Sequence, residues 1–238
     1  RINNRIRKIT PSGVVSTFLG GGTVGLSDAT GTNAEFTAPI GIVIDELGNI
    51  YIAQQGAIRK ATAAGVVTTI AGSGTTAAAD GTGSSAGFHT PTGITLGNDG
   101  NLYVADNQAN QIRQVTLDGV VTRIAGSGQN SFRDGEALNA LFNQPVDLAV
   151  AENGDIYISD HRNGSIRVLT PECLVLSGDA TGQSGDHAIV LQAADGNGDP
   201  VQQSFTVSVL TAPSVIVSPV SDLTSNTATL NGNVTSDG

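Results

Sequence analysis

Residues 112–128, IRQVTLDGVVTRIAGSG, have counterparts at 6–22 (IRKITPSGVVSTFLGGG) and 58–74 (IRKATAAGVVTTIAGSG), and a shorter one, IRVLTP, at 166–171. Their first isoleucines follow one another at steps of 52, 54 and 54 residues. A period of several tens of residues means that each unit is one supersecondary element, which buries its apolar face on its neighbours. The sequence therefore predicts a repeat protein over residues 1–171.

Each repeat unit contains four short segments with the alternation that is typical of strands. In one unit they lie at 93–97, 101–106, 111–116 and 120–126, with Gly, Asn or Asp breaks between them. Four antiparallel strands per unit form a propeller blade, so we predict an all-β fold with about three such blades. Between the quoted stretches, a proline and a tyrosine recur in step: Pro39, Pro91 and Pro145, then Tyr51, Tyr103 and Tyr157.

The recurring proline, the core GNLYVAD or its variants, and the IRK and VTTIAG segments resemble bacterial NHL repeats over residues 1–171. The resemblance implies a β-propeller, often six-bladed, whose loops bind proteins, RNA or glycans. Six blades of about 54 residues would need roughly 320 residues, so only part of a propeller is expected here.

Residues 172–238 differ in style from the repeats. The stretch 176–209 alternates on either side of the turn DGNGDP and resembles the C-terminal half of a cadherin-like or immunoglobulin-like module of bacterial surface proteins. Residues 212–238 resemble the opening strands of a fibronectin type III-like module. We therefore expect blades at 1–171, a partial Ig-like sandwich at 172–211 and the start of a third module at 212–238. The chain would then be part of a larger protein, with a missing segment near 171–174.

Charge and composition disfavour several classes of protein. The net charge is −10, and all Lys and Arg residues lie at or before Arg167, which argues against nucleic-acid binding. No 18-residue apolar stretch and no charged-then-apolar leader occur, so neither membrane insertion nor a retained signal peptide is expected. The single cysteine, Cys173, excludes a disulfide within one chain.

Several side chains recur at fixed positions of the repeat. The arginine after the repeat isoleucine could form a ring of positive charge, but we interpret it as a structural partner of acids in adjacent blades. The aspartates that end the tyrosine strand line one face or, as we prefer, cap strands through local backbone bonds. The linking segments 27–36, 79–88 and 133–142 carry phenylalanines that would plug the seam between blades, and their variable polar residues form the predicted binding rim. These residues are Arg7, Arg59, Arg113 and Arg167; Asp106 and Asp160, with Gln54 in the matching slot; and Phe36, Phe88 and Phe142.

One segment has the spacing of a metal site. Asp195, Asn197 and Asp199 give D-x-N-x-D, whose oxygen ligands suit calcium, although the closing glutamate of a full calcium loop is absent. The alternative is a glycine-rich hairpin turn without a metal. The histidines His89, His161 and His187 are too scattered for a metal site. No catalytic or cofactor motif occurs, so neither catalytic residues nor a cofactor is predicted.

We therefore predict a non-enzymatic binding or adhesion scaffold, extracellular or on the cell surface, which binds a protein or a glycan through propeller loops. Its other partners would be neighbouring copies or the rest of a larger chain. Two alternatives stay open. One is a propeller enzyme, such as a metal-dependent lyase or lactonase, with its ligands in missing blades. The other is a structural subunit of a surface layer or filament, in which strands of a neighbouring copy complete the sheets.

Overall fold

The computed structural model describes residues 3–171 in full and, beyond them, the strands within 185–193, 201–209, 214–217, 222–224, 227–229 and 232–235. The chain divides into two compact units, Arg1–Pro171 and Glu172–Gly238. All sheets are antiparallel, and the only helices in the described part are short 3-10 turns. The all-β prediction is therefore confirmed for these residues.

Two sheets are complete blades. Blade 1 has the strand order β3-β4-β5-β6, and blade 2 has the order β8-β9-β10-β11, with the short strand β7 added beyond β11. The strands are β3 Gly41–Ile44, β4 Ile50–Gln54, β5 Ala57–Ala61, β6 Val67–Ala71, β7 Gly81–Thr82, β8 Pro91–Leu96, β9 Leu102–Asp106, β10 Gln111–Val115 and β11 Val120–Ala125. These bounds agree with the four predicted segments to within two residues, because period-2 alternation marks strands that bury one face.

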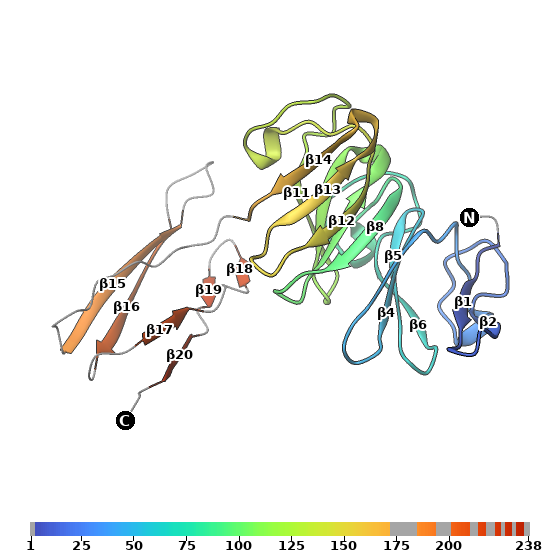
Figure 1. Ribbon diagram of the computed structural model, residues 1–238, viewed down its shortest axis with the longest axis horizontal. Helices are drawn as coiled ribbons and strands as arrows, with labels where there is room; N and C mark the ends of the chain where they lie inside the picture. Colours follow the sequence, from blue (N-terminus) through green and yellow to red (C-terminus); the bar gives the residue numbers. More distant parts are fainter. Residues whose placement is uncertain are drawn as a thin grey trace. The chain divides into compact units, whose positions relative to one another are not determined.

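Two sheets are partial. Blade 3 has three strands, β12 (Pro145–Val150), β13 (Ile156–Asp160) and β14 (Ser165–Leu169), in the order β12-β13-β14. The hairpin of β1 (Ile6–Ile9) and β2 (Val15–Leu19) corresponds to the third and fourth strands of a blade. The first strands of successive blades, such as β8 and β12, lie side by side (Figure 1).

The core of the first unit consists of apolar layers between neighbouring blades. One layer joins blades 1 and 2 and contains Tyr51, Phe88 and Val121; a second joins blades 2 and 3 and contains Tyr103, Phe142 and Ile158. A third layer joins the β1–β2 hairpin to blade 1 around Phe36. The three phenylalanines are almost fully buried, so the prediction that they fill the seams between blades is confirmed.

Blade 3 exposes the face that blades 1 and 2 bury. Ile166 is 68% exposed, whereas its equivalent Ile112 is fully buried; Tyr157 is 44% exposed, whereas Tyr103 is 8% exposed. The difference follows from the repeat, because among the described residues no further blade packs on this face.

The second unit contains three separate pairs of strands among its described residues. β15 (Gly185–Ala193) pairs with β16 (Val201–Val209), as the alternating pattern predicts. β17 (Ser214–Val217) pairs with β20 (Gly232–Thr235), and β18 (Asp222–Thr224) pairs with β19 (Thr227–Thr229). The Ig-like and fibronectin-like assignments remain predictions.

Candidate functional site

Three loops of equal length lead from the last strand of one blade to the first strand of the next. We call residues 20–36, 72–88 and 126–142 the rim loops. They contain the 3-10 turns η1 (Gly31–Asn33), η2 (Gly83–Ser85) and η4 (Ala137–Asn139); the turns η3 (Asn107–Ala109) and η5 (His161–Asn163) lie between second and third strands. Antiparallel order places the rim loops and the η3 and η5 turns at the same end of the blades.

A glycine begins each rim loop for a steric reason. Gly72 has φ +94°, and a Cβ there would lie 2.3 Å from the Gly56 carbonyl oxygen. Gly126 has φ +88°, with the Asn110 carbonyl oxygen 2.4 Å from the same point. Only glycine tolerates both the positive φ and the close backbone approach. The start of each loop is therefore fixed to the strand pair that precedes it.

A buried arginine holds the middle of each rim loop. Arg59 donates to the Asp28 carboxylate at 2.8 Å, Arg113 to Asp80 at 2.6 Å and Arg167 to Asp134 at 2.5 Å. The acid lies 31 to 33 residues before its arginine and belongs to the loop that leads into the same blade. The prediction of a structural arginine holds, but the prediction that its acids lie in adjacent blades is wrong, because the connecting loop folds back over the third strand.

The same guanidinium also fixes the end of each loop. It lies over the ring of the seam phenylalanine, with 5.2 Å from Arg59 to the Phe36 centroid and 5.5 Å from Arg113 to the Phe88 centroid. Arg59 and Arg113 donate as well to loop carbonyl oxygens, at Glu35 and Gly87. Burial lowers the pKa of Arg59 while Asp28 opposes the shift, so this cation depends on its partner.

Asp106 and Asp160 are fully buried and bind backbone far away in the chain. Asp106 accepts N–H bonds from His89 and Thr90, and Asp160 accepts one from Asn143. The predicted capping role is therefore right in kind, but the capped backbone is the lead-in to the first strand rather than a local turn. Burial raises the pKa of Asp106, although the two N–H bonds and Arg113 act in the opposite direction.

Gln54 takes the aspartate position in blade 1. Its Oε1 accepts from the Thr37 N–H at 3.4 Å and lies 3.4 Å from an Arg59 nitrogen, while its Nε2 has no partner. Arg59 therefore has one carboxylate partner, whereas Arg113 and Arg167 have two each. Arg7, the fourth repeat arginine, is exposed and donates to the Ser16 carbonyl oxygen. The arrangement is a set of buried clusters, and it does not present a ring of positive charge.

The variable part of each rim loop lies between its glycines and its anchoring aspartate. We call these segments the tips: residues 23–27 (TVGLS), 75–79 (TTAAA) and 129–133 (QNSFR). Residues 75–79 and 129–133 are all exposed, and Phe132 and Val24 are large apolar tip residues with 53% and 65% exposure. The tips are the parts of the predicted binding rim that are free to contact a ligand.

Tyrosine hydroxyls are fixed at the opposite end of the blades. Tyr51 donates to the Asp45 carboxylate at 3.0 Å, and Tyr103 donates to Asp99 at 2.9 Å. Burial and the neighbouring carboxylate raise the pKa of Tyr51 to about 12. Burial alone would raise the pKa of Asp45, but hydrogen bonds from Asn49 and Tyr51 hold it below its usual value. These groups hold the turns and present no free acid or base.

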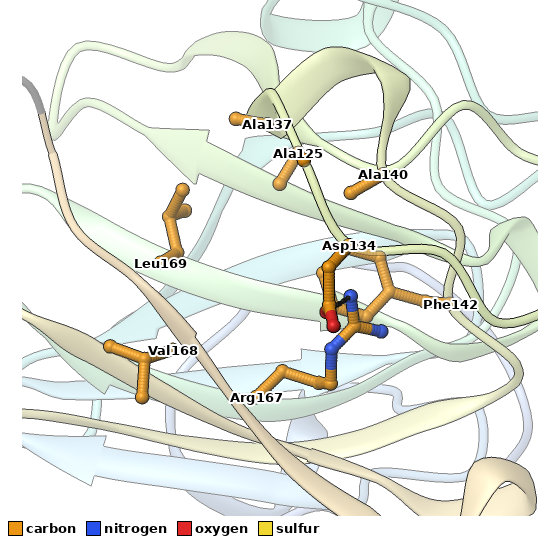
Figure 2. Close-up of a pocket in the computed structure, with 9 residues that line it drawn as sticks. Ala125, Asp134, Ala137, Ala140, Phe142, Arg167, Val168 and Leu169 are labelled. Carbon is orange, nitrogen blue, oxygen red and sulfur yellow. Dashed lines mark hydrogen bonds and ion pairs between the residues drawn. The ribbon is translucent and has the colours of Figure 1, made fainter.

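A cavity of about 240 Å³ lies beside the third arginine cluster, where the cluster is most open. It is lined by Ala125, Asp134, Gly135, Ala137, Ala140, Phe142, Arg167, Val168 and Leu169. Figure 2 shows the Arg167 guanidinium against Asp134 and Phe142, with the three alanines on the other side. Asp134 is 74% exposed here, compared with 47% for Asp28 in the matching place of blade 1.

The predicted calcium ligands Asp195, Asn197 and Asp199 lie outside the described residues, as does Cys173. His89 lies beside the first strand of blade 2, where its ring is within 3.1 Å of the Thr90 hydroxyl, and His161 is exposed. Among the described residues, no three His, Cys, Asp or Glu side chains are grouped so that they could hold a metal ion. In the same part of the chain, no helix has the length and apolar character required to cross a membrane.

The NHL repeat family matches residues 88–115 and 142–169, which are the segments from the seam phenylalanine to the third strand of blades 2 and 3. A Bacteroides thetaiotaomicron protein of unknown function has a similar solved structure, with 27% identity, a TM-score of 0.57, and coverage of 70% of this chain and 42% of that one. An auxiliary nutrient binding protein from the same organism matches with 20% identity, a TM-score of 0.56 and the same coverage. The chain therefore carries NHL repeats folded as propeller blades.

Three curated proteins share sequence with parts of the chain. SUPPRESSOR OF QUENCHING 1, chloroplastic, of Arabidopsis thaliana is 35% identical over 82 residues, which cover 33% of this chain and 8% of that protein. Teneurin-3 of Danio rerio is 26% identical over 196 residues, or 69% of this chain and 7% of that protein. "Probable peptidyl-alpha-hydroxyglycine alpha-amidating lyase pgal-1" of Caenorhabditis elegans is 34% identical over 73 residues, or 31% of this chain and 20% of that protein. The chain thus spans a small part of each of these relatives.

Proposed function

We propose that this chain is a binding scaffold of an exported or surface protein, with the tips of the rim loops as its interaction surface. The observation that carries the proposal is the division of labour within each loop. A glycine, an aspartate and a phenylalanine fix the loop at the same three positions in every repeat, whereas the five-residue tips share only the threonine that begins the first two of them. Rigid elements that present variable loops are a common way to build binding sites.

The tip chemistry suits a protein or glycan partner. The tips offer hydroxyl, amide and apolar groups, with Arg133 as their one cation. Phe132 is exposed at the third tip and lies over the Arg167 guanidinium at 4.6 Å, so it is held in place rather than free to fold away. An aromatic ring in a fixed position is the kind of residue that contributes strongly at interfaces. The likeness to an auxiliary nutrient binding protein is a likeness of fold, and the loops therefore carry the proposal.

A tip exchange tests this function without disturbing the anchors. The chain would be screened against arrayed glycans and purified cell-surface proteins, and each ligand found would be titrated against a variant in which the third tip, QNSFR, is replaced by the second, TTAAA. We expect affinity to fall at least about tenfold while the thermal midpoint stays within a few degrees. Exchange of exposed residues at the opposite end, such as Leu117 and Asp118, is the control. Unchanged binding in the tip variant would contradict the proposal.

A second candidate is an enzyme, and the likeness to the named lyase over 73 residues favours it. An enzyme of that kind needs a metal or a catalytic group in parts of the chain or the larger protein beyond the described residues. Elemental analysis of the purified protein tests this directly, because a stoichiometric transition metal retained through gel filtration would support the enzyme and argue against a pure scaffold.

A further inference from the structure

We infer that the outer edge of β14 and the cavity beside it form an acceptor site for an extended peptide segment of a partner protein, which would complete blade 3 as a fourth strand. In blades 1 and 2 the third strand is covered by β6 and β11, whereas β14 is the last strand of its sheet among the described residues. An uncovered strand edge presents unpaired backbone groups that can pair with another chain. This site is separate from the rim-loop tips, and the inference does not depend on the proposed function.

The cavity is the socket of one particular side chain. In the layer between blades 1 and 2, Val121 of β11 packs with four other buried positions: Ala71, Ala86, Phe88 and Val115. The equivalent positions one repeat later are Ala125, Ala140, Phe142 and Leu169, and all four line the cavity. The equivalent of Val121 is the member that no described residue supplies. The site therefore fits a valine or a similar side chain two positions before the residue that faces Arg167.

The Arg167 cluster selects a second position of the peptide. In blade 1, Thr69 faces Arg59 across the strand pair and donates both its N–H and its hydroxyl to Asp28, at 3.1 and 2.9 Å. Asp134 occupies the place of Asp28 in blade 3 and is more exposed. A threonine facing Arg167 would make the same two bonds to Asp134. Hydrogen bonds to a charged acceptor are among the stronger ones, so this position contributes specificity as well as affinity.

The register of the complete blades defines the remaining position. A bulge follows in every third-to-fourth strand pair, after which the first residue of the third strand faces a small or apolar residue: Leu19 opposite Ile6, Ala71 opposite Ile58 and Ala125 opposite Ile112. The matching residue of blade 3 is Ile166, which is 68% exposed. The predicted ligand is therefore an antiparallel segment of the pattern Val-x-Thr-x-Ala, without charge at the inward positions.

A peptide that copies β6 is the direct probe. A labelled peptide of sequence VVTTIAG, residues 66–72 of this chain, would be titrated into the full chain by fluorescence anisotropy. We expect saturable one-to-one binding. Replacing the second valine by aspartate, or the threonine that stands for Thr69 by valine, should weaken binding at least about tenfold, because the first puts a charge in an apolar socket and the second removes a bond to a carboxylate.

Matched protein variants locate the site. Asp134→Ala should reduce the affinity by the same factor, whereas Asp80→Ala, the equivalent position in a complete blade, should leave it unchanged. Hydrogen exchange should slow in β14 on peptide binding and stay the same in β10. Because a tip exchange leaves these groups in place, failure of the rim-loop proposal and failure of this one are distinguishable.

Three results would overturn the inference: no saturable binding, equal affinity for the aspartate analogue, or protection confined to elements other than β14. A free chain whose β14 amides already exchange as slowly as those of β10 would also overturn it. In that case the edge is already filled, by other residues of the same chain if protection is independent of concentration, or by a second copy if dilution removes it.

Discussion

Replacing Arg113 by methionine should destabilise the first unit far more than an ordinary core substitution. Its guanidinium is fully buried, donates to Asp80 at 2.6 Å and to the Gly87 carbonyl at 3.2 Å, and lies 3.6 Å from the Asp106 carboxylate. Methionine keeps the apolar stem but leaves the buried Asp106 without a cation. Loss of one partner of a buried ion pair costs about 3–5 kcal/mol, a large share of the roughly 5–15 kcal/mol that stabilises a typical domain.

Urea unfolding followed by tyrosine fluorescence measures this loss, because all three tyrosines lie in the blades and the chain has no tryptophan. Without Arg113, the folded-state pKa of Asp106, which burial already raises, should rise further. A raised carboxyl pKa means that the folded state binds the proton more tightly, so the variant should regain stability as pH falls through that pKa. Adding Asp106→Asn should restore part of the loss, since Gln54 shows that blade 1 accepts a neutral amide there. Arg123→Met, which removes one bond to the Gly126 carbonyl, is the control and should cost less than about 1 kcal/mol. A loss below about 1 kcal/mol for Arg113→Met, with no dependence on pH, would refute the reasoning.

Three further predictions follow from the anchors and the turns. Gly72→Ala should cost about 2–4 kcal/mol in urea unfolding, because its Cβ would lie 2.3 Å from the Gly56 carbonyl oxygen at φ +94°; Gly100→Ala, at φ +79° with nothing within 4 Å, should cost about 1 kcal/mol, and equal losses would show that the close approach is unimportant. The pKa of Tyr51 near 12 in the folded state means that stability is fully present below pH 10 and falls by about 2 kcal/mol by pH 12; Tyr51→Phe should flatten this alkaline limb, and an unchanged limb would assign it to other groups. The calcium hypothesis for residues 195–199 predicts heat on isothermal titration with calcium that disappears in Asp195→Ala, whereas no heat in the parent chain supports the glycine-rich turn.

The blades could be predicted from sequence because two periodicities coincide in them. Alternation with period 2 marked the strands, and the repeat of 52 to 54 residues aligned them, so an error in one unit was corrected by the others. The seam phenylalanines were found in the same way, since a large apolar residue that recurs at a fixed position in a polar segment is typical of a buried contact. These features depend on patterns that are local or repeated.

The arginine clusters could be predicted only in part. The recurrence of Arg59 and Arg113 indicated a structural role, but their partners lie more than 30 residues earlier in the chain. A signal for them existed: Asp28, Asp80 and Asp134 recur at steps of 52 and 54 residues, as the arginines do. Opposite charges that keep a constant separation through every repeat are good candidates for a pair. The long-range bonds of Asp106 had no such signal, because this acceptor pairs with backbone N–H groups, which residues of almost any type provide.

The cavity beside β14 could not be predicted from the pattern at all, because it is defined by a side chain that other blades supply and no described residue of blade 3 does. Its lining is made of ordinary core positions of the repeat. What turns them into a candidate site is the packing of the neighbouring blade, which holds Ala125, Ala140 and Phe142 in place whether or not a fourth strand covers them. The acceptor site is therefore already formed in the free chain, so the main cost of binding would be the ordering of the peptide itself. For the same reason, the anchors and the tips should separate experimentally: substitutions at Arg113 or Gly72 should change stability, whereas an exchange of residues 129–133 should change binding alone.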